Sequence, residues 1–139
     1  IEKFEEAFVE HNLEKIKTVG DAILAVSGLS SMDESSVKNC VDCSYKLKAI
    51  ANSYSMPWDL HVGIHYGSLV AGTIGKKTVQ YDILGKSVNI AFNICDMSEP
   101  NQILISSDAW MTARSEINVN SIGLKKLKSG QEVEILECN

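Results

Sequence analysis

Six polar residues in this 139-residue sequence stand at positions where a side chain could act on a ligand. They are Lys17, Asp21, Asp82, Asn89, Asn93 and Lys128. Lysine amines and asparagine amides donate hydrogen bonds, whereas aspartate oxygens accept them or bind hard cations such as Mg²⁺. The role of each residue therefore depends on the backbone element that positions it.

Asp21 lies at the tip of a predicted β-hairpin. The pair Gly20-Asp21 separates two short β-rich runs, 13–19 and 22–27, which is a strong hairpin pattern. The ordinary explanation for this aspartate is a turn stabilised by its own side chain. A metal ligand is the alternative, although Mg²⁺ usually takes a second anchor and substrate phosphates beside one carboxylate.

Two lysines and an aspartate lie on predicted strands. Lys15 and Lys17 share one face of the strand 13–19, and Asp82 lies in the strand 79–84. Solvated lysines and edge aspartates are common on exposed strands. These positions alone therefore do not indicate a function.

Asn89 and Asn93 are four residues apart in a predicted helix, 86–97, so they share one face of it. Lys128 opens a Lys-Ser-Gly turn between two predicted strands. A solvated turn lysine explains Lys128 as well as a ligand contact does.

The remaining periodicities predict an α+β domain that spans residues 1–139, with helices covering a sheet. A helix at 1–11 opens the chain, and a long helix capped by Asp33 or Ser35 runs to about residue 54, before Met56-Pro57. A glycine-containing connection from Gly67 to Thr78 joins the strand 60–66 to the strand 79–84. The other expected elements are a strand at 102–106, a helix at 107–114, and strands at about 118–124 and 132–137.

Cys40 and Cys43 form a C-x2-C pattern, which can indicate zinc or redox chemistry. Together with Leu47, Ile50 and Tyr54 they recur at helical spacing, which places both thiols on the apolar face of a helix. No second C-x2-C follows in the sequence, and no histidine pair suited to one zinc ion, to complete four zinc ligands. We therefore interpret all four cysteines as structural, a pattern that suits a reducing cytosol.

Two further patterns resemble sites that they do not complete. The run from Gly72 to Thr78 looks like a phosphate loop, but its spacing fails and a strand follows it instead of a helix. His61 and His65 lie on the same side of a strand, roughly 13 Å apart at ~3.3 Å per residue, which is too far for one zinc ion. We expect His65 to be packed or to lie at a dimer face.

Composition limits the class of partner. The net charge is −5, with 45% hydrophobic and 22% charged residues, as in an ordinary globular domain. An acidic balance disfavours nonspecific nucleic-acid binding, which needs lysines and arginines at the phosphates. No apolar run in the sequence approaches the roughly 20 residues that span a bilayer. We therefore expect no nucleic-acid partner, no membrane contact by this segment, and a cytoplasmic catalytic domain whose whole protein could be attached to a membrane.

Several blocks, in order along nearly the whole chain, resemble class III adenylate and guanylate cyclase catalytic domains. The blocks are Lys15-Ile16-Lys17-Thr18-Val19-Gly20-Asp21-Ala22, Ala25-Val26-Ser27-Gly28-Leu29, His61-Val62-Gly63-Ile64-His65-Tyr66-Gly67, Val70-Ala71-Gly72-Thr73-Ile74-Gly75, Tyr81-Asp82-Ile83-Leu84-Gly85 and Ser87-Val88-Asn89-Ile90-Ala91. The resemblance implies the ferredoxin-like cyclase fold. It also implies a first strand, with a first metal-binding aspartate, and a helix upstream of this N-terminally truncated domain, so that open hydrogen-bonding edges are expected inside the sheet.

The resemblance implies a role for each polar residue. Asp21 matches the second metal aspartate, for two Mg²⁺ or Mn²⁺ ions per site. Lys17 and Asp82 match the pair that selects the purine, and a lysine donor with an aspartate acceptor suits adenine, whereas guanylate cyclases usually carry glutamate and cysteine there. Asn89 matches the residue that orients the ribose, and Lys128 matches the lysine that grips the terminal phosphates.

Asn93 departs from the family, which normally has an arginine at this position to stabilise the pentavalent phosphate. An amide brings no positive charge, and loss of one such donor can lower the rate on the order of 10²–10³-fold. Three hypotheses follow. The first is an adenylate cyclase that makes cyclic AMP from ATP at a site shared by two catalytic domains, as a homodimer or pseudo-heterodimer. The second is a nucleotide-binding pseudo-cyclase half that needs a complementary partner, and the third is an interaction domain that binds no nucleotide.

Overall fold

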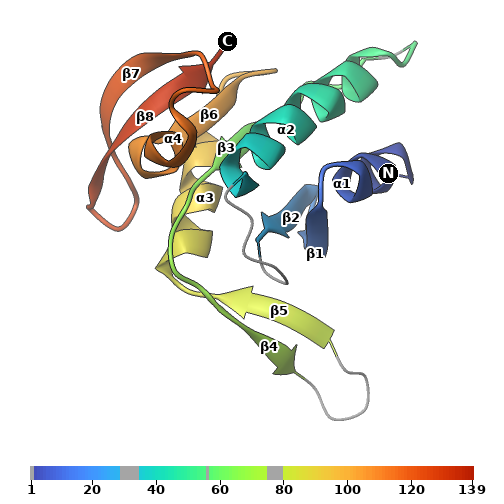
Figure 1. Cartoon of the computed structure of the whole chain (residues 1–139), viewed down its shortest axis with the longest axis horizontal. Helices are drawn as coiled ribbons and strands as arrows, with labels where there is room; N and C mark the ends of the chain where they lie inside the picture. Colours follow the sequence, from blue (N-terminus) through green and yellow to red (C-terminus); the bar gives the residue numbers. More distant parts are fainter. Residues whose placement is uncertain (1, 29–34, 56, 75–79) are drawn as a thin grey trace.

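The computed structural model describes residues 2–28, 35–55, 57–74 and 80–139 (Figure 1). Its elements are α1 (Glu2–Glu10), β1 (Leu13–Val19), β2 (Ala22–Ser27), α2 (Ser36–Asn52), β3 (Val62–Ile64), β4 (Val70–Ile74), β5 (Gln80–Leu84), α3 (Lys86–Met97), β6 (Ile103–Ser106), α4 (Ser107–Ala113), β7 (Val119–Lys126) and β8 (Glu132–Cys138). β1 with β2 and β4 with β5 form antiparallel hairpins. The α+β class is confirmed.

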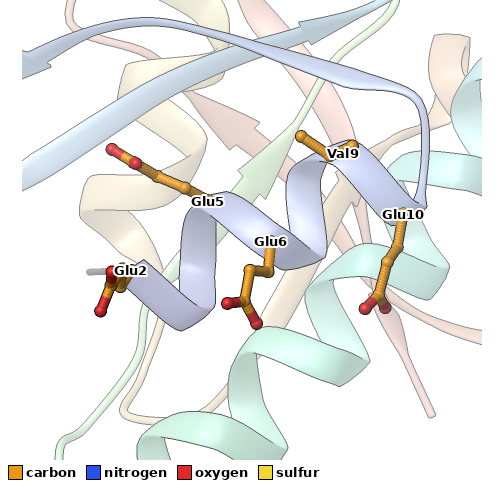
Figure 2. Close-up of a pocket in the computed structure, with 5 residues that line it drawn as sticks. All are labelled: Glu2, Glu5, Glu6, Val9 and Glu10. Carbon is orange, nitrogen blue, oxygen red and sulfur yellow. The ribbon is translucent and has the colours of Figure 1, made fainter.

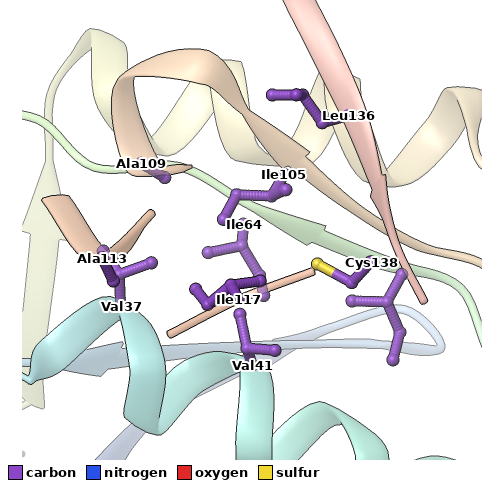
Figure 3. Packing of buried hydrophobic residues seen from close by; sticks show 10 residues of the cluster. Val37, Val41, Ile64, Ile105, Ala109, Ala113, Ile117, Leu136 and Cys138 are labelled. Atoms are coloured by element: carbon purple, nitrogen blue, oxygen red, sulfur yellow. The ribbon is translucent and has the colours of Figure 1, made fainter. Parts of the chain in front are cut away.

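The other strands form a sheet of order β3-β6-β8-β7, in which β3 runs parallel to β6 and the other pairs are antiparallel. All four residues of β6 are buried, as expected for a strand inside a sheet that helices cover on both faces. Side chains alternate between the faces, so Ile105 packs with α2 and α4 on one side (Figure 3), while Leu104 packs with α3 on the other.

Besides the hydrophobic clusters on the two faces of this sheet, a third one lies where α1 covers the β1–β2 hairpin and α2. Its buried members are Phe4, Ala7, Phe8, Cys43, Ile50 and Ala51. Burial raises the pKa of the Cys40 thiol to about 12 and that of Cys43 to about 11, so both thiols stay protonated at neutral pH. All four cysteines are free, which agrees with their interpretation as structural residues.

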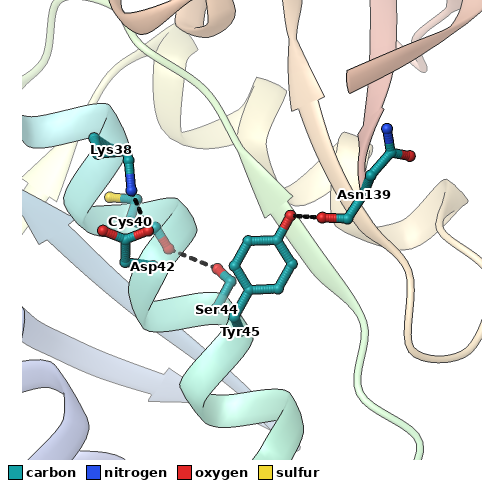
Figure 4. A network of polar contacts seen from close by, with 6 residues as sticks. All are labelled: Lys38, Cys40, Asp42, Ser44, Tyr45 and Asn139. Carbon is teal, nitrogen blue, oxygen red and sulfur yellow. Dashed lines mark hydrogen bonds and ion pairs between the residues drawn. The ribbon is translucent and has the colours of Figure 1, made fainter. Parts of the chain in front are cut away.

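Polar contacts within and beyond α2 fix its position (Figure 4). Lys38 pairs with Asp42 at 2.5 Å on the exposed side of the helix, and Ser44 donates to the carbonyl of Cys40 at 2.7 Å. The Tyr45 hydroxyl donates to the backbone carbonyl of Asn139, which joins α2 to the end of the chain after β8.

Helix α2 also connects the hairpin to the main sheet. It packs against both β2 and β3. Among the described residues, β2 pairs only with β1, and β3 pairs only with β6. Both strands therefore present an edge without a strand partner within the described part of the chain.

The structure corrects the prediction for the segment between Gly67 and Thr78. This segment is not only a connection, because β4 lies within it and pairs with β5 from Val70 opposite Leu84 to Ile74 opposite Gln80. The two strands form an arm below α3 (Figure 1), and β5 contacts both β1 and α3. Residues 75–79, which include the rest of the apparent phosphate loop, lie outside the described residues.

The helix predicted to run to about residue 54 and the strand predicted at 60–66 are both shorter in the structure. Helix α2 ends at Asn52 because Ser53 closes the last turn, its N–H and its hydroxyl donating to the carbonyl of Ile50 at 3.1 and 2.7 Å. Tyr54 therefore lies beyond the helix and stacks on Trp58 with ring centroids 5.6 Å apart. β3 covers three residues, because a side chain binds the backbone before it: the Leu60 N–H donates to Asn101 Oδ1 at 3.2 Å.

Ser35 occupies the N-cap position of α2, and the alternative cap, Asp33, lies outside the described residues. None of the described helices is long and apolar enough to cross a membrane.

Candidate active site on helix α3 and the β1–β2 hairpin

Helix α3 presents a polar face built from three residues. Asn89, Asn93 and Asp96 follow each other at a spacing of four and then three, which places them in one row along the helix. An adjoining face, about 100° around the helix, packs into the core through Ile90, Ile94 and Met97. Since the apolar side is fixed against the sheet, the polar row is held facing outward.

A glycine allows α3 to lie directly on β3. A Cβ atom at Gly63 would come within 2.6 Å of the Ala91 carbonyl oxygen and closer still to the Cys95 amide nitrogen. Both of these are backbone atoms of α3, so no side chain could move aside. Gly63 therefore sets the height of the helix above the strand, and with it the position of the polar row.

Lys128 lies beside this polar row. Its backbone N–H donates to Asn93 Oδ1 at 3.4 Å, while Asn93 Nδ2 donates to the carbonyl of Asn89 at 2.7 Å. The structure thus brings together three of the six residues singled out in the sequence. They come from α3 and from the turn between β7 and β8.

Asp96 completes this cluster and was missed in the sequence. Its carboxylate lies 3.6 Å from the Lys128 amine, with the two side chains 63% and 81% exposed. An ion pair this exposed contributes only about 0.2–1 kcal/mol. The spacing of Asp96 after Asn93 is the pattern that would have found it.

Arg114, the only arginine in the sequence, lies away from the polar row. It is the C-cap residue of α4, which covers the face of the sheet opposite α3. Within the described part of the chain, Arg114 therefore does not lie beside Asn93.

The β1–β2 hairpin carries Lys17 and Asp21. The predicted turn at Gly20-Asp21 is present, with Gly20 at φ 62°. The predicted shared face of Lys15 and Lys17 is interrupted, because the pairing register shifts between them; a bulge of this kind redirects side chains. Lys15 instead pairs with Glu5 of α1 at 2.9 Å.

Asp21 is exposed at the tip of the β1–β2 hairpin. Burial raises the pKa of the Cys95 thiol, and the carboxylates of Asp96 and Asp21 act in the same direction. The charge of Asp21 therefore reaches helix α3 of the same chain.

Strand β1, which carries Lys17, lies against strand β5, which carries Asp82. The backbone of Asp82 pairs with Gly72 of β4, and its side chain lies outside the described part of the structure. The two strands whose residues were matched to purine selection are thus neighbours, although they are more than sixty residues apart in the sequence.

The described residues supply one candidate carboxylate ligand for a Mg²⁺ site, Asp21. Within the ranges that the structure describes, no three His, Cys, Asp or Glu side chains converge as metal ligands. Asp21 is exposed and within electrostatic reach of α3, so it can bind an ion that takes its other ligands from phosphates and from a further carboxylate.

The two histidines of the β3 region have separate structural partners. His61 Nδ1 lies 2.9 Å from the carbonyl of Ser98, and His65 Nδ1 lies 2.7 Å from Ser106 Oγ. Ser106 is the N-cap of α4, and its hydroxyl also accepts from the Ala109 N–H at 3.2 Å. His65 is therefore a packed residue, as one of the two expectations stated.

A second group of acidic residues lies on the exposed face of α1 (Figure 2). A shallow pocket there is lined by Glu2, Glu5, Glu6, Val9 and Glu10. All five come from one helix, and Glu5 is paired with Lys15. The geometry is that of a solvated helix face.

Comparison with known proteins gives three informative similarities. The chain is 29% identical over 138 residues to the soluble guanylate cyclase gcy-31 of Caenorhabditis elegans, covering 95% of this chain and 19% of that protein. It is 33% identical over 98 residues to the aggregation-specific adenylate cyclase of Dictyostelium discoideum, covering 70% of this chain and 7% of that protein. The guanylate cyclase domain of RhGC from Catenaria anguillulae, solved in complex with GTP, has a TM-score of 0.91 at 16% identity, covering 98% of this chain and 77% of that one.

A model of the adenylate and guanylate cyclase catalytic domain family matches residues 1–136. The chain belongs to this family, and the cyclase catalytic fold predicted from its sequence is confirmed. It spans a fifth or less of the length of the two relatives described above.

Proposed function

We propose that this chain is an adenylate cyclase catalytic domain, which converts ATP to 3′,5′-cyclic AMP and pyrophosphate at a site shared by two such domains. The observation that carries the choice of ATP is the contact between β1 and β5, the strands of Lys17 and Asp82. A lysine amine can donate to N1 of adenine, and a carboxylate can accept from its 6-amino group. Guanine presents the opposite donor and acceptor there.

In the proposed reaction the ribose 3′-oxygen attacks the α-phosphorus, and the proton of this hydroxyl is released to solvent. The bond from the α-phosphorus to the oxygen that bridges to the β-phosphate breaks, and pyrophosphate leaves. Asn89 orients the ribose, and Lys128 binds the terminal phosphates, where its charge offsets the charge of the leaving group. When bound, Mg²⁺ supplies charge stabilisation at the phosphates and lowers the pKa of the attacking hydroxyl.

The first test is an assay of the full-length protein with ATP and GTP, in Mg²⁺ and in Mn²⁺. We expect cyclic AMP as the main product, with kcat/KM for ATP about 10²-fold or more above that for GTP, because a wrong purine leaves polar groups unpaired. Equal or greater turnover of GTP would contradict the assignment.

A second candidate function is a binding half that is active only beside a complementary domain. It is favoured by Asn93, whose amide hydrogen-bonds to Asn89 and Lys128 of its own chain and carries no charge. This alternative predicts that ATP raises the melting temperature of the homodimer without turnover. Addition of a domain with an arginine at the corresponding position would then produce cyclic AMP.

A further inference from the structure

Asn93 bridges helix α3 and the turn that carries Lys128. We propose that Asn93 is a positioning residue for Lys128, holding the backbone of this lysine against α3 so that its amine is directed to the terminal phosphates of the nucleotide. The inference rests on the proposed function for its ligand. In this proposal Asn93 has a role of its own, and is not only a weaker substitute for the arginine that the family normally has at this position.

The turn itself is anchored through Leu127. Leu127 is 4% exposed. It packs with Ile94 of α3, which is fully buried, in the hydrophobic cluster between α3 and the four-stranded sheet. Its N–H donates to the Gln131 carbonyl at 2.8 Å, and its carbonyl accepts from the Gly130 N–H at 2.9 Å. These contacts fix the turn at Leu127, but they do not direct the next residue, which is exposed.

The Asn93 amide directs that next residue. Its oxygen accepts from the Lys128 N–H at 3.4 Å, while its nitrogen donates to the Asn89 carbonyl at 2.7 Å. Since both ends of the amide are used within the chain, its rotamer is fixed from both sides. The side chain is therefore committed to joining the helix and the turn.

Asp96 holds the other end of the lysine. The carboxylate lies 3.6 Å from the amine, and both groups are largely exposed to water. A pair this exposed is weak, so a triphosphate with several negative oxygens can displace Asp96 from the lysine. Asn93 therefore keeps the backbone in place while the amine exchanges Asp96 for phosphate.

The test compares Asn93→Ala, Lys128→Ala and the double variant in the full-length protein. Two inhibitors separate the parts of the site, because inorganic pyrophosphate probes the phosphate contacts and adenosine probes the base and ribose contacts. We expect Asn93→Ala to weaken inhibition by pyrophosphate about fivefold, the value of one ordinary hydrogen bond. Inhibition by adenosine should change less than about twofold, as for a change that leaves the base contacts intact.

In the Lys128→Ala background, Asn93→Ala should have no further effect, because coupled residues are not additive. A full additional loss in that background would overturn the proposal, since Asn93 would then contact phosphate directly. The matched control is Lys126→Ala, another exposed lysine of the same hairpin, which should leave both inhibition constants unchanged. A loss as large as that of Asn93→Ala in this control would also contradict the proposal, since general charge would then explain the effect.

Hydrogen exchange of the Lys128 amide gives a readout that does not require nucleotide. Asn93→Ala should increase its exchange rate several-fold, because the amide loses its acceptor, while the Leu127 amide keeps its own. An unchanged Lys128 rate would overturn the proposal. The two proposals can fail separately. If Asn93→Ala speeds exchange of the Lys128 amide but the wild-type protein binds neither pyrophosphate nor adenosine, the proposed function is refuted while the contact between Asn93 and Lys128 is supported.

Discussion

Lys128 has two partners on helix α3, and they restrain different parts of it. Asn93 contacts the backbone of the lysine, and Asp96 contacts its amine. Asn89, Asn93 and Lys128 could each be selected from the sequence, the asparagines by their shared helix face and Lys128 by the resemblance to the cyclase family. Their connection could not be predicted, because it depends on how the β7–β8 turn packs on α3 through Leu127.

At the residue scale, Asp96→Asn should act in the direction opposite to Asn93→Ala. It removes the charge that competes with phosphate for the Lys128 amine, so inhibition by pyrophosphate should become about two- to threefold tighter at low salt. The difference should shrink as salt is raised. Weaker inhibition by pyrophosphate would mean that Asp96 supports the bound state and does not compete with it.

At the scale of elements, the site depends on how α3 sits on β3. The helices could be predicted to within about two residues from apolar periodicity and from their glycine and proline boundaries. Strand β4 was not predicted, because Gly72 interrupts its β-branched residues and glycines flank it at Gly67 and Gly75, so that the segment resembles a connection; pairing with β5 defines the strand. The bulge between Lys15 and Lys17 likewise has no local signal.

Gly63→Ala should destabilise the protein by about 3 kcal/mol, because the added methyl group would overlap backbone atoms of α3. Urea unfolding measures the change in the free energy of unfolding. Gly130→Ala is the control: unlike Gly63, Gly130 has a positive φ, 92°, and no atom lies near its added methyl group, so the change should cost only about 1–2 kcal/mol from backbone strain. Equal losses in the two variants would show that crowding against α3 is unimportant.

The N-terminus of α4 should be sensitive to pH through His65. Burial lowers the pKa of His65 below 6.5, and the charge of Asp108 opposes this shift only in part. The unfolded state therefore binds more protons, so stability is fully present above pH 6.5 and decreases as pH falls from there through the folded pKa. In urea unfolding at pH 7.5 and 5.5, wild type should lose more stability than His65→Gln, and an equal loss would contradict the role of this histidine.

At the scale of the whole molecule, the groups matched to the reaction lie on two separate supports. Asp21 lies on a hairpin that joins the main sheet through α2, whereas Asn89 and Lys128 belong to the layer formed by α3 and the four-stranded sheet. The arm of β4 and β5 extends from this body (Figure 1). Such an arrangement suits a site completed by a second domain, as we propose.

Mixing two inactive variants tests this arrangement. Asp21→Asn and Asn89→Ala homodimers should each be inactive, but a mixed dimer would hold one intact site. After random exchange of subunits, half of the dimers are mixed, so about a quarter of the wild-type activity should return. Lys17→Ala mixed with Asn89→Ala should stay inactive, since in the proposed arrangement one domain supplies Asp21 to a site and the other domain supplies both Lys17 and Asn89. Recovery in that control, or none in the first mixture, would contradict a shared site.

The central claim is that Lys17 and Asp82 together recognise adenine. The most direct measurement is the ratio of cyclic AMP to cyclic GMP formed by the full-length protein and by its Lys17→Glu/Asp82→Cys variant, at equal ATP and GTP. The wild type should form cyclic AMP almost alone, and the double variant should shift the ratio toward cyclic GMP by about 10²-fold or more, because the exchanged groups match guanine. A ratio that is the same in both proteins would contradict the account.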